Sequence, residues 1–133
     1  MEQAIATFVV INFLIIGFSH LVQPKLWMGF FGILHAQGNA GVFANGFLTL
    51  LTGSLIVAFH NVWSGLPIVL TLIGWAFVAK SALILVFPEI GLMSLARSQT
   101  MPLMKFRIAG AGLIAVATML VYAIMSGAYE PAG

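Results

Sequence analysis

Residues Leu66–Glu89 read LPIVLTLIGWAFVAKSALILVFPE, and this stretch decides the class of the protein. The 22 residues from Leu66 to Phe87 contain a single charged side chain, Lys80. At a rise of ~1.5 Å per residue, a helix of this length reaches about 33 Å, and the hydrocarbon core of a bilayer is about 30 Å thick. The stretch therefore predicts a transmembrane helix that carries an ionisable group.

The composition of the whole chain points the same way. Of 133 residues, 62% are hydrophobic and only 6% are charged, whereas soluble domains carry about 25% charged residues. This balance excludes an ordinary water-soluble fold. Five Lys and Arg against three Asp and Glu are too few for a nucleic-acid-binding surface, so no nucleic-acid partner is expected. Because cysteine is absent, disulfides, thiol nucleophiles and Cys-ligated metals are excluded.

Four segments have the length and apolarity of membrane spans, which predicts an all-α membrane protein with a single domain over residues 1–133. The spans are expected at residues 4–22, 41–59, 66–87 and 106–125, with connectors at 24–39 and 88–101. Pro24 and Pro88 end the first and third spans, because proline disfavours helix in the residue before it. The apolar residues of the first connector fall at helical spacing, which favours a short helix in the membrane interface. A re-entrant hairpin is the alternative.

The basic residues predict the orientation. Lys25 lies in the first connector, and Arg97, Lys105 and Arg107 lie in or beside the second, whereas the turn between the second and third spans has none. Loops rich in Lys and Arg stay in the cytoplasm. The sequence therefore predicts that both connectors are cytoplasmic and that both termini are outside.

An internal similarity relates the two halves of the chain. Shifted by 64 residues, Leu21-Val22-Gln23-Pro24 falls on Leu85-Val86-Phe87-Pro88, Phe31 on Leu95, and Gly46 on Gly110. Asn45 falls on Ala109, so the polar face of the second span is not repeated. The match predicts two tandem two-helix repeats, which would form a pseudo-twofold four-helix bundle about an axis along the membrane normal.

Lys80 is the first candidate for a functional residue, because an ionisable side chain inside a span is costly. No Asp or Glu lies within any expected span. Lys80 must therefore snorkel to the interface, be neutral, pair with a partner subunit, or hold an anionic ligand. Snorkelling is the commoner behaviour of such a lysine. The expected ligand-binding residues are Lys80, Asn45, Thr49, Ser19 and Ser81, although a helical wheel sets Ser81 about 100° from Lys80.

The histidines do not predict a metal or haem site. His20 is expected at the cytoplasmic end of the first span and His60 at the outer end of the second, so one site cannot use both. No carboxylate or thiolate accompanies either at ligand spacing. The sequence offers no nucleophile–base pair, no paired carboxylates and no phosphate-cradling glycine loop. We therefore expect no catalytic residue, no metal and no cofactor.

One segment supports a resemblance. The order His60-Asn61-x-Trp63, then Thr71-x-x-Gly74-Trp75, then Lys80 and Pro88-Glu89 resembles small uncharacterised four-helix integral membrane proteins of bacteria. The resemblance covers residues 53–89. It implies a membrane location and a bacterial origin, and it implies no chemistry.

These features favour a non-enzymatic protein of a bacterial plasma (inner) membrane, either an accessory subunit or a helix bundle that associates with itself. Its expected partners are the lipid bilayer and further copies or a larger membrane complex. The alternative is a carrier or binding protein for a small anionic or lipid-like ligand that uses Lys80. A membrane enzyme or haem protein is the third interpretation.

Overall fold

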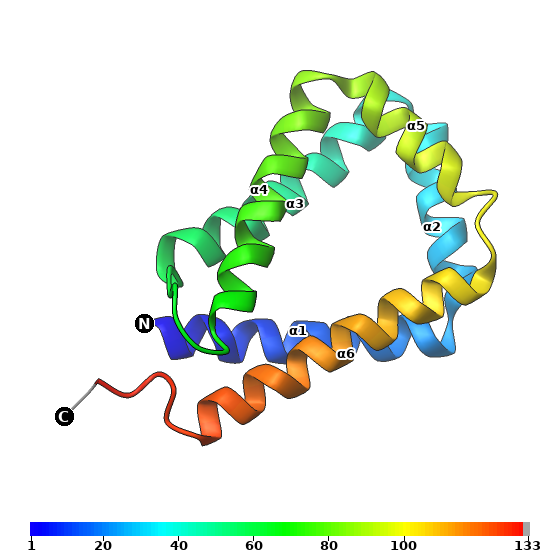
Figure 1. Cartoon of the computed structure of the whole chain (residues 1–133). Coiled ribbons are helices and arrows are strands. Elements are labelled where there is room, and N and C mark those ends of the chain that lie inside the picture. The colour runs from blue at the N-terminus through cyan, green and yellow to red at the C-terminus, as the bar shows by residue number, and fades with distance from the viewer. Residues whose placement is uncertain (132–133) are drawn as a thin grey trace.

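The computed structural model describes residues 1–131, and six α-helices make up its secondary structure (Figure 1). They are α1 (Glu2–Val22), α2 (Pro24–Ala36), α3 (Asn39–Phe59), α4 (Ile68–Val86), α5 (Pro88–Ser98) and α6 (Leu103–Met125). The helices α1, α3, α4 and α6 are long and apolar enough to cross a membrane. The predicted all-helical class with four candidate spans is therefore confirmed for the described part of the chain.

Prolines and a glycine set the helix boundaries. Pro24 and Pro88 occupy the first turns of α2 and α5, where their missing N–H group costs nothing. α4 begins at Ile68, two residues later than the sequence suggests, because Gly65 has a positive φ of 61° and closes the preceding turn. α6 begins at Leu103, directly after Pro102 and three residues before the expected start of the fourth span at residue 106.

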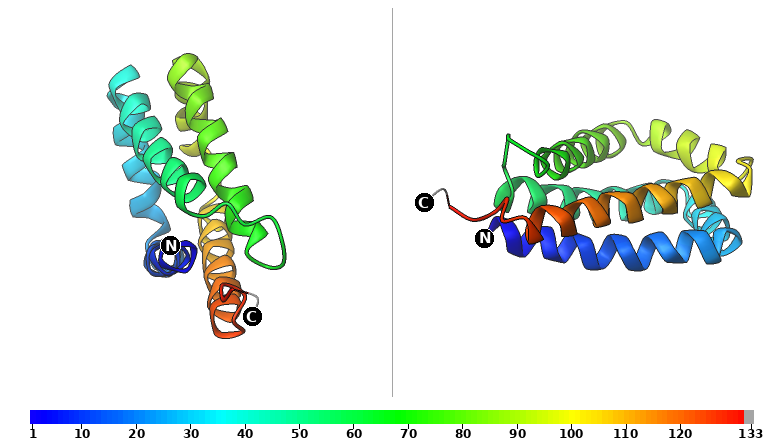
Figure 2. Two further views of the ribbon diagram at one scale, coloured as in Figure 1. Left: turned by 90° about the vertical axis from the view of Figure 1, so that its left-hand side faces the viewer. Right: turned by 60° about the horizontal axis from the view of Figure 1, so that its bottom comes forward.

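The helices form two layers, with α1–α3 in one and α4–α6 in the other (Figure 2). Across the layers, α1 packs along α6, α3 along α4, and α2 beside α5. The two long pairs diverge from a narrow end, which holds both termini and the α3–α4 turn, toward a wide end that α2 and α5 bridge (Figure 1). The four long helices are thus arranged as two pairs set at an angle, and not as one evenly packed bundle.

A glycine pair lets the backbones approach closely within each long pair. In α1 and α6, a Cβ on Gly17 would lie 2.8 Å from the Gly110 carbonyl oxygen, and one on Gly110 would lie 2.5 Å from that of Gly17. In α3 and α4, a Cβ on Gly53 would lie 3.0 Å from the Gly74 carbonyl oxygen. Small residues serve this purpose in membranes, where packing rather than water exclusion drives association.

Two separate apolar cores hold the pairs at their angle. At the narrow end all four long helices contribute to one core, formed by Ala6, Val9, Val10, Phe13, Ile56, Leu70, Ala117 and Leu120. At the wide end a smaller core joins α2, α3, α4 and α5 through Leu34, Val42, Ile84 and Leu95. Because neither core extends along the whole length of the pairs, the region between them is not filled by the protein.

The bridge at the wide end is pinned by a hydrogen bond between α2 and the end of α5. The side-chain amide of Gln99 donates to the carbonyl oxygen of Met28 at 3.1 Å. Gly32 makes room for that amide, because a Cβ there would lie 2.7 Å from Gln99 Oε1. The bridge therefore closes the wide end with polar as well as apolar contacts.

Candidate functional site

Two adjoining cavities occupy the wedge between the α1–α6 pair and the α3–α4 pair. The lysine cavity, of about 260 Å³, lies toward the wide end and is lined by His20, Phe31, Asn45, Lys80, Ser94, Leu95, Ser98, Met101, Lys105, Phe106 and Ala109. The apolar cavity, of about 280 Å³, lies toward the narrow end and is lined by Phe8, Val9, Asn12, Phe13, Ile16, Leu48, Thr49, Thr52, Phe77, Lys80 and Leu113. Lys80 lines both, so the two cavities meet at its side chain.

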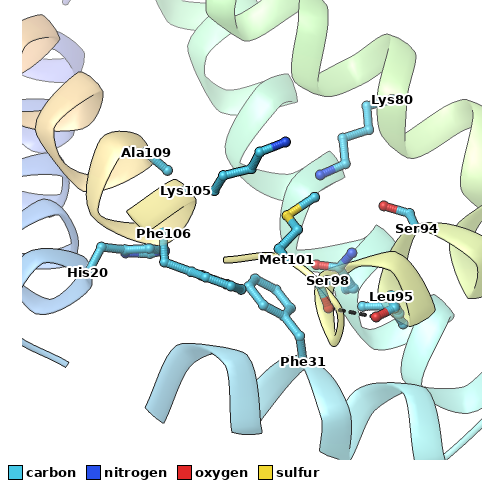
Figure 3. Close-up of a pocket in the computed structure, with 11 residues that line it drawn as sticks. His20, Phe31, Lys80, Ser94, Leu95, Ser98, Met101, Lys105, Phe106 and Ala109 are labelled. Carbon is cyan, nitrogen blue, oxygen red and sulfur yellow. Dashed lines mark hydrogen bonds between the residues drawn. The ribbon is translucent and has the colours of Figure 1, made fainter. Parts of the chain in front are cut away.

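Two ammonium groups enter the lysine cavity from opposite sides. Lys80 extends from α4 and Lys105 from α6, and their side chains point toward one another (Figure 3). Ser94 of α5 presents its hydroxyl group beside them (Figure 3). Asn45 of α3 adds an amide to the lining. Cations, a hydroxyl and an amide are all groups that donate hydrogen bonds to an anion.

The charge in the lysine cavity is not balanced within its lining. No Asp or Glu is among the residues that line either cavity. Lys105 also lies in the first turn of α6, where the helix dipole adds positive potential. Both lysines are exposed at the cavity surface, and like charges that share one cavity repel one another. An anion placed between them would reverse this unfavourable term.

Aromatic rings form the wall of the lysine cavity at the junction of α1, α2 and α6. His20 stacks on Trp27 with ring centroids 4.0 Å apart, and Phe31 stacks on Phe106 at 6.1 Å. The Nδ1 atom of His20 lies 2.9 Å from the carbonyl oxygen of Ile16, which accepts its proton. That contact fixes the ring, and it leaves the other ring nitrogen as a hydrogen-bond acceptor in the neutral form.

Asn12, Thr49 and Thr52, which line the apolar cavity, each donate a hydrogen bond to a carbonyl oxygen of their own helix. Asn12 donates to the Phe8 carbonyl at 2.8 Å, and Thr49 donates to the Asn45 carbonyl at 2.8 Å. Thr52 does the same to the Leu48 carbonyl at 2.9 Å. Apart from these three side chains and Lys80 at one end, the lining is aliphatic and aromatic, which suits hydrocarbon.

The structure divides the residues that the sequence proposed for ligand binding. Lys80 and Asn45 line the lysine cavity, and Thr49 lines the apolar cavity beside Lys80. Ser19 lies elsewhere, where its hydroxyl accepts a 2.8 Å hydrogen bond from the Trp27 indole. Ser81 is fully buried and donates to the Val78 carbonyl at 2.9 Å. The 100° separation of Ser81 from Lys80 on the helical wheel is consistent with this division.

Sequence reasoning missed Lys105 and Ser94 as members of the site. Lys105 served only as evidence for orientation, and Ser94 sits in an amphipathic connector whose folding back was not foreseen. The available signal was the placement of both Lys80 and Lys105 toward the same end of the molecule. Because α6 packs along α1 and lies across the wedge from α4, Lys80 and Lys105 line the same cavity.

A second polar cluster lies at the narrow end, away from both cavities. His60 is fully buried, with Nδ1 3.2 Å from Thr71 Oγ1 and Nε2 3.0 Å from the Tyr129 hydroxyl. Thr71 donates to the Val62 carbonyl at 2.7 Å, so its oxygen accepts from Nδ1–H, and Tyr129 donates to Nε2. Burial lowers the pKa of His60 below its usual value. Burial, and secondarily the charge of Glu2, raises the pKa of Tyr129 to about 12.

The lining of the wedge combines two lysines, a serine and an asparagine with apolar side chains, and it holds no carboxylate. Comparisons of this chain with protein-family models, with curated proteins and with solved structures find no match.

Proposed function

We propose that this protein binds an anionic ligand, a lipid or a small solute, between its two helix pairs. The observation that carries the proposal is the convergence of Lys80 and Lys105 on one cavity whose lining holds no carboxylate. This is the binding or carrier role that Lys80 alone suggested, now with a second cation opposite it. No catalytic step is part of the proposal.

The energetics favour occupation by an anion. A lysine at the centre of a span costs ~2.5–3.5 kcal/mol on insertion scales; Lys80, which lies past the middle of α4, carries part of that cost, and Lys105 in the first turn of α6 carries less. Two lysines that face one cavity add mutual repulsion to that cost. An anion between them replaces the repulsion with two attractions and accepts charge-assisted hydrogen bonds, which are about twice as strong as neutral ones. Ser94 and Asn45 supply neutral donors at the same place.

The test compares anionic and neutral ligands on the purified full chain. Phosphatidylglycerol, phosphatidylcholine and inorganic pyrophosphate are added separately to protein in mild detergent, and melting temperature and native-mass adducts are recorded. We expect phosphatidylglycerol or pyrophosphate, and not phosphatidylcholine, to raise the melting temperature and remain bound. At a ligand concentration 100-fold above Kd the stabilisation reaches about 2.7 kcal/mol.

The double variant Lys80→Gln/Lys105→Gln should lose this stabilisation and the adducts. Lys25→Gln is the matched control, because Lys25 is exposed, as Lys80 and Lys105 are, but lines neither cavity. Equal retention of anionic ligand by the double variant and by the control would show that the wedge is not an anion site.

A second candidate function, association with another membrane helix, is favoured by the outer face of α6. Gly112 is exposed, and a Cβ there would meet nothing within 4 Å. Ala111 and Ala115 are exposed on the same helix. Such a surface permits a close approach by a helix of a second copy or of a larger complex. Native mass of the wild type and of Gly112→Leu, measured in the same detergent, tests this role.

We also propose that the chain is a tandem repeat of two two-helix units. The residues before the two prolines, Gln23 and Phe87, share nearly the same backbone angles (φ −125°, ψ 51° and φ −123°, ψ 78°). Five pairs of residues that line the cavities are separated by 64 positions: Phe13 and Phe77, Ile16 and Lys80, Thr49 and Leu113, Phe31 and Leu95, Asn45 and Ala109. This supports a cavity built about the pseudo-twofold axis, in which only one half supplies the lysines.

We propose in addition that the wide end faces the cytoplasm, so that both termini are outside. Lys25 lies in α2 and Arg97 in α5, and Lys105 and Arg107 lie at the start of α6. The positive-inside rule supports this orientation. The bacterial plasma membrane is the compartment that the resemblance described above implies.

A further inference from the structure

We propose that the ligand is a phospholipid with an anionic head, held so that its phosphate lies between Lys80 and Lys105 while one acyl chain fills the apolar cavity. This inference rests on the proposed function and narrows it to one class of ligand and one pose. It draws on both cavities and on the position of Lys80 between them.

The two cavities together match the two parts of an amphiphile. The lysine cavity offers cationic and hydroxyl groups, and the apolar cavity offers Val9, Phe13, Ile16, Phe77 and Leu113. Because Lys80 lines both, a ligand bound to its ammonium group has the apolar cavity directly beside it. A free inorganic anion would use only the lysine cavity, whereas a phospholipid with an anionic head uses both.

The size and lining of the apolar cavity favour hydrocarbon over water. Its volume of about 280 Å³ exceeds the ~150 Å³ of an engineered apolar protein cavity that stays dry and binds benzene. Water requires two to four polar partners, and the polar side chains among the lining are few: Asn12, Thr49 and Thr52, each of which already donates one hydrogen bond to its own helix, and Lys80 at one end. A chain that enters from the bilayer meets the packing contacts that water cannot make.

The apolar cavity has a rim that faces the bilayer. Phe8 of α1 is 47% exposed and Leu48 of α3 is 63% exposed, and both line the cavity. α1 and α3 contact each other only lightly. An acyl chain can therefore leave between these two helices while its head stays at the lysines.

Selection in this pose comes from the head and not from the chain. Lipid tails are as apolar as the side chains of a membrane helix, so moving a chain from the bilayer into the cavity changes the hydrophobic free energy little. The attraction between phosphate and two ammonium groups is what favours the bound state. Neutral and anionic lipids with the same chain should therefore differ sharply in occupancy.

The test places photoreactive lipids around the full chain. Nanodiscs of phosphatidylcholine are doped with phosphatidylglycerol or phosphatidylcholine that carries a diazirine in one acyl chain, and labelled residues are located by tandem mass spectrometry. We expect phosphatidylglycerol to label the cavity positions Asn12 and Thr49 at least tenfold more than phosphatidylcholine does, and to label Phe8, at the exposed rim, more than phosphatidylcholine does but by a smaller factor. Both lipids should label the outward-facing positions Ile15, Phe47 and Leu51 equally; these side chains are 67%, 62% and 59% exposed.

Two variants and one control sharpen the readout. Lys80→Gln/Lys105→Gln should reduce cavity labelling by phosphatidylglycerol to the level of phosphatidylcholine. Thr49→Trp, which fills the apolar cavity, should reduce cavity labelling at Phe8 and Asn12, whereas Leu51→Trp on the outer face of the same helix should not. Because a cavity-filling variant can fail to fold, the melting temperature of each variant in phosphatidylcholine is measured alongside, and Leu113→Phe serves as a milder replacement.

The outcomes separate this inference from the proposed function. If phosphatidylglycerol is retained in a lysine-dependent way but labels the cavity no more than phosphatidylcholine does, the chain lies outside and the pose is wrong, while anion binding stands. If inorganic pyrophosphate stabilises the protein and phosphatidylglycerol does not, the ligand is a soluble anion and the inference fails. If no anion is retained in a lysine-dependent way, both proposals fail.

Discussion

Lys80 and Lys105 are the charged side chains that line the lysine cavity. Each is tolerable near a membrane surface, because a lysine stem reaches several ångströms toward water. Directed into one cavity from opposite helix pairs, they create a positive field that neither produces alone. A Lys80 that snorkels to water and a Lys80 that binds an anion would have this same geometry. Substitution of Lys80 distinguishes the two roles.

Replacing Lys80 with leucine should therefore have opposite effects in two lipids. In phosphatidylcholine, Lys80→Leu should raise the melting temperature, because part of the ~2.5–3.5 kcal/mol insertion cost of a central lysine is removed. With phosphatidylglycerol, wild-type protein should gain stability and the Leu variant should not. Lys80→Arg keeps the charge but changes its shape, so weaker retention of phosphatidylglycerol is expected. A Leu variant that keeps the full anionic stabilisation would assign Lys80 to snorkelling.

His60 provides the pH dependence expected of this structure. Its burial favours the neutral ring, so the folded-state pKa lies below the ~6.5 of the unfolded chain. The unfolded state then binds more protons, and stability is highest above about pH 6.5 and falls as pH decreases through the folded-state value. We expect melting scans in detergent to show this loss between pH 7.5 and 5.

Substitution assigns that pH slope to His60. In His60→Gln the slope should flatten, whereas His35→Gln, at an exposed histidine of α2, should preserve it. Tyr129→Phe removes the donor to Nε2 and should cost about 1–3 kcal/mol at neutral pH, because a buried acceptor loses its partner. A slope that persists unchanged in His60→Gln would place its origin at another group.

At the scale of the helices, glycines decide which faces meet. At the Gly17–Gly110 and Gly53–Gly74 contacts, the missing Cβ lets the backbone of one helix lie against a carbonyl oxygen of the other. Gly112 lies in the same helix as Gly110 and has open space around it. The sequence, which groups them as one small-residue segment, does not separate a helix-packing glycine from an outward one.

Two leucine substitutions test this distinction. Gly53→Leu should destabilise the protein by about 1–3 kcal/mol or more, because its Cβ would lie 2.8 Å from Phe77 Cβ and 2.9 Å from the Val78 nitrogen. Gly112→Leu should leave the monomer as stable or slightly more so, since leucine favours helix over glycine. Thermal unfolding in detergent measures both. Equal damage from the two would contradict the assigned helix faces.

At the scale of the whole molecule, the wedge depends on how the pairs are tied at their ends. The core at the narrow end joins all four long helices, and Tyr129 packs against it from the C-terminal segment. The bridge of α2 and α5 spans the wide end. This arrangement places the polar connectors and most of the basic residues at one end and both termini at the other (Figure 1).

Cysteine accessibility tests the orientation of that arrangement. The native chain has no cysteine, so single substitutions give no background. Cys at Ser64 and at Ser126 should react with an impermeant maleimide outside intact cells, and Cys at Thr100 should react only after the membrane is opened. All three positions are exposed, whereas Ser98 in the same connector is buried and unsuitable. If only the Cys at Thr100 were labelled on intact cells, the proposed orientation would be wrong and the wide end would lie outside.

The local features of this protein can be predicted from its sequence. The helical class, the number of candidate spans, and the ends of α1 and α4 at Pro24 and Pro88 follow from hydropathy, helix rise and proline chemistry, which act within one or two turns. The sequence also identifies Lys80 as the exceptional residue, because its cost in a span does not depend on the neighbours.

Which helices pair, and therefore what Lys80 faces, is visible only in the folded structure. In a membrane protein the lipid-facing and the packed sides of a helix are both apolar, so hydropathy does not indicate the inward face. The pairing of α1 with α6 depends on contacts such as Gly17 with Gly110, which are remote in sequence. That pairing sets Lys105 opposite Lys80 and leaves Ser19 and Ser81 outside the wedge, because a cavity is defined by several helices at once and no single span encodes it.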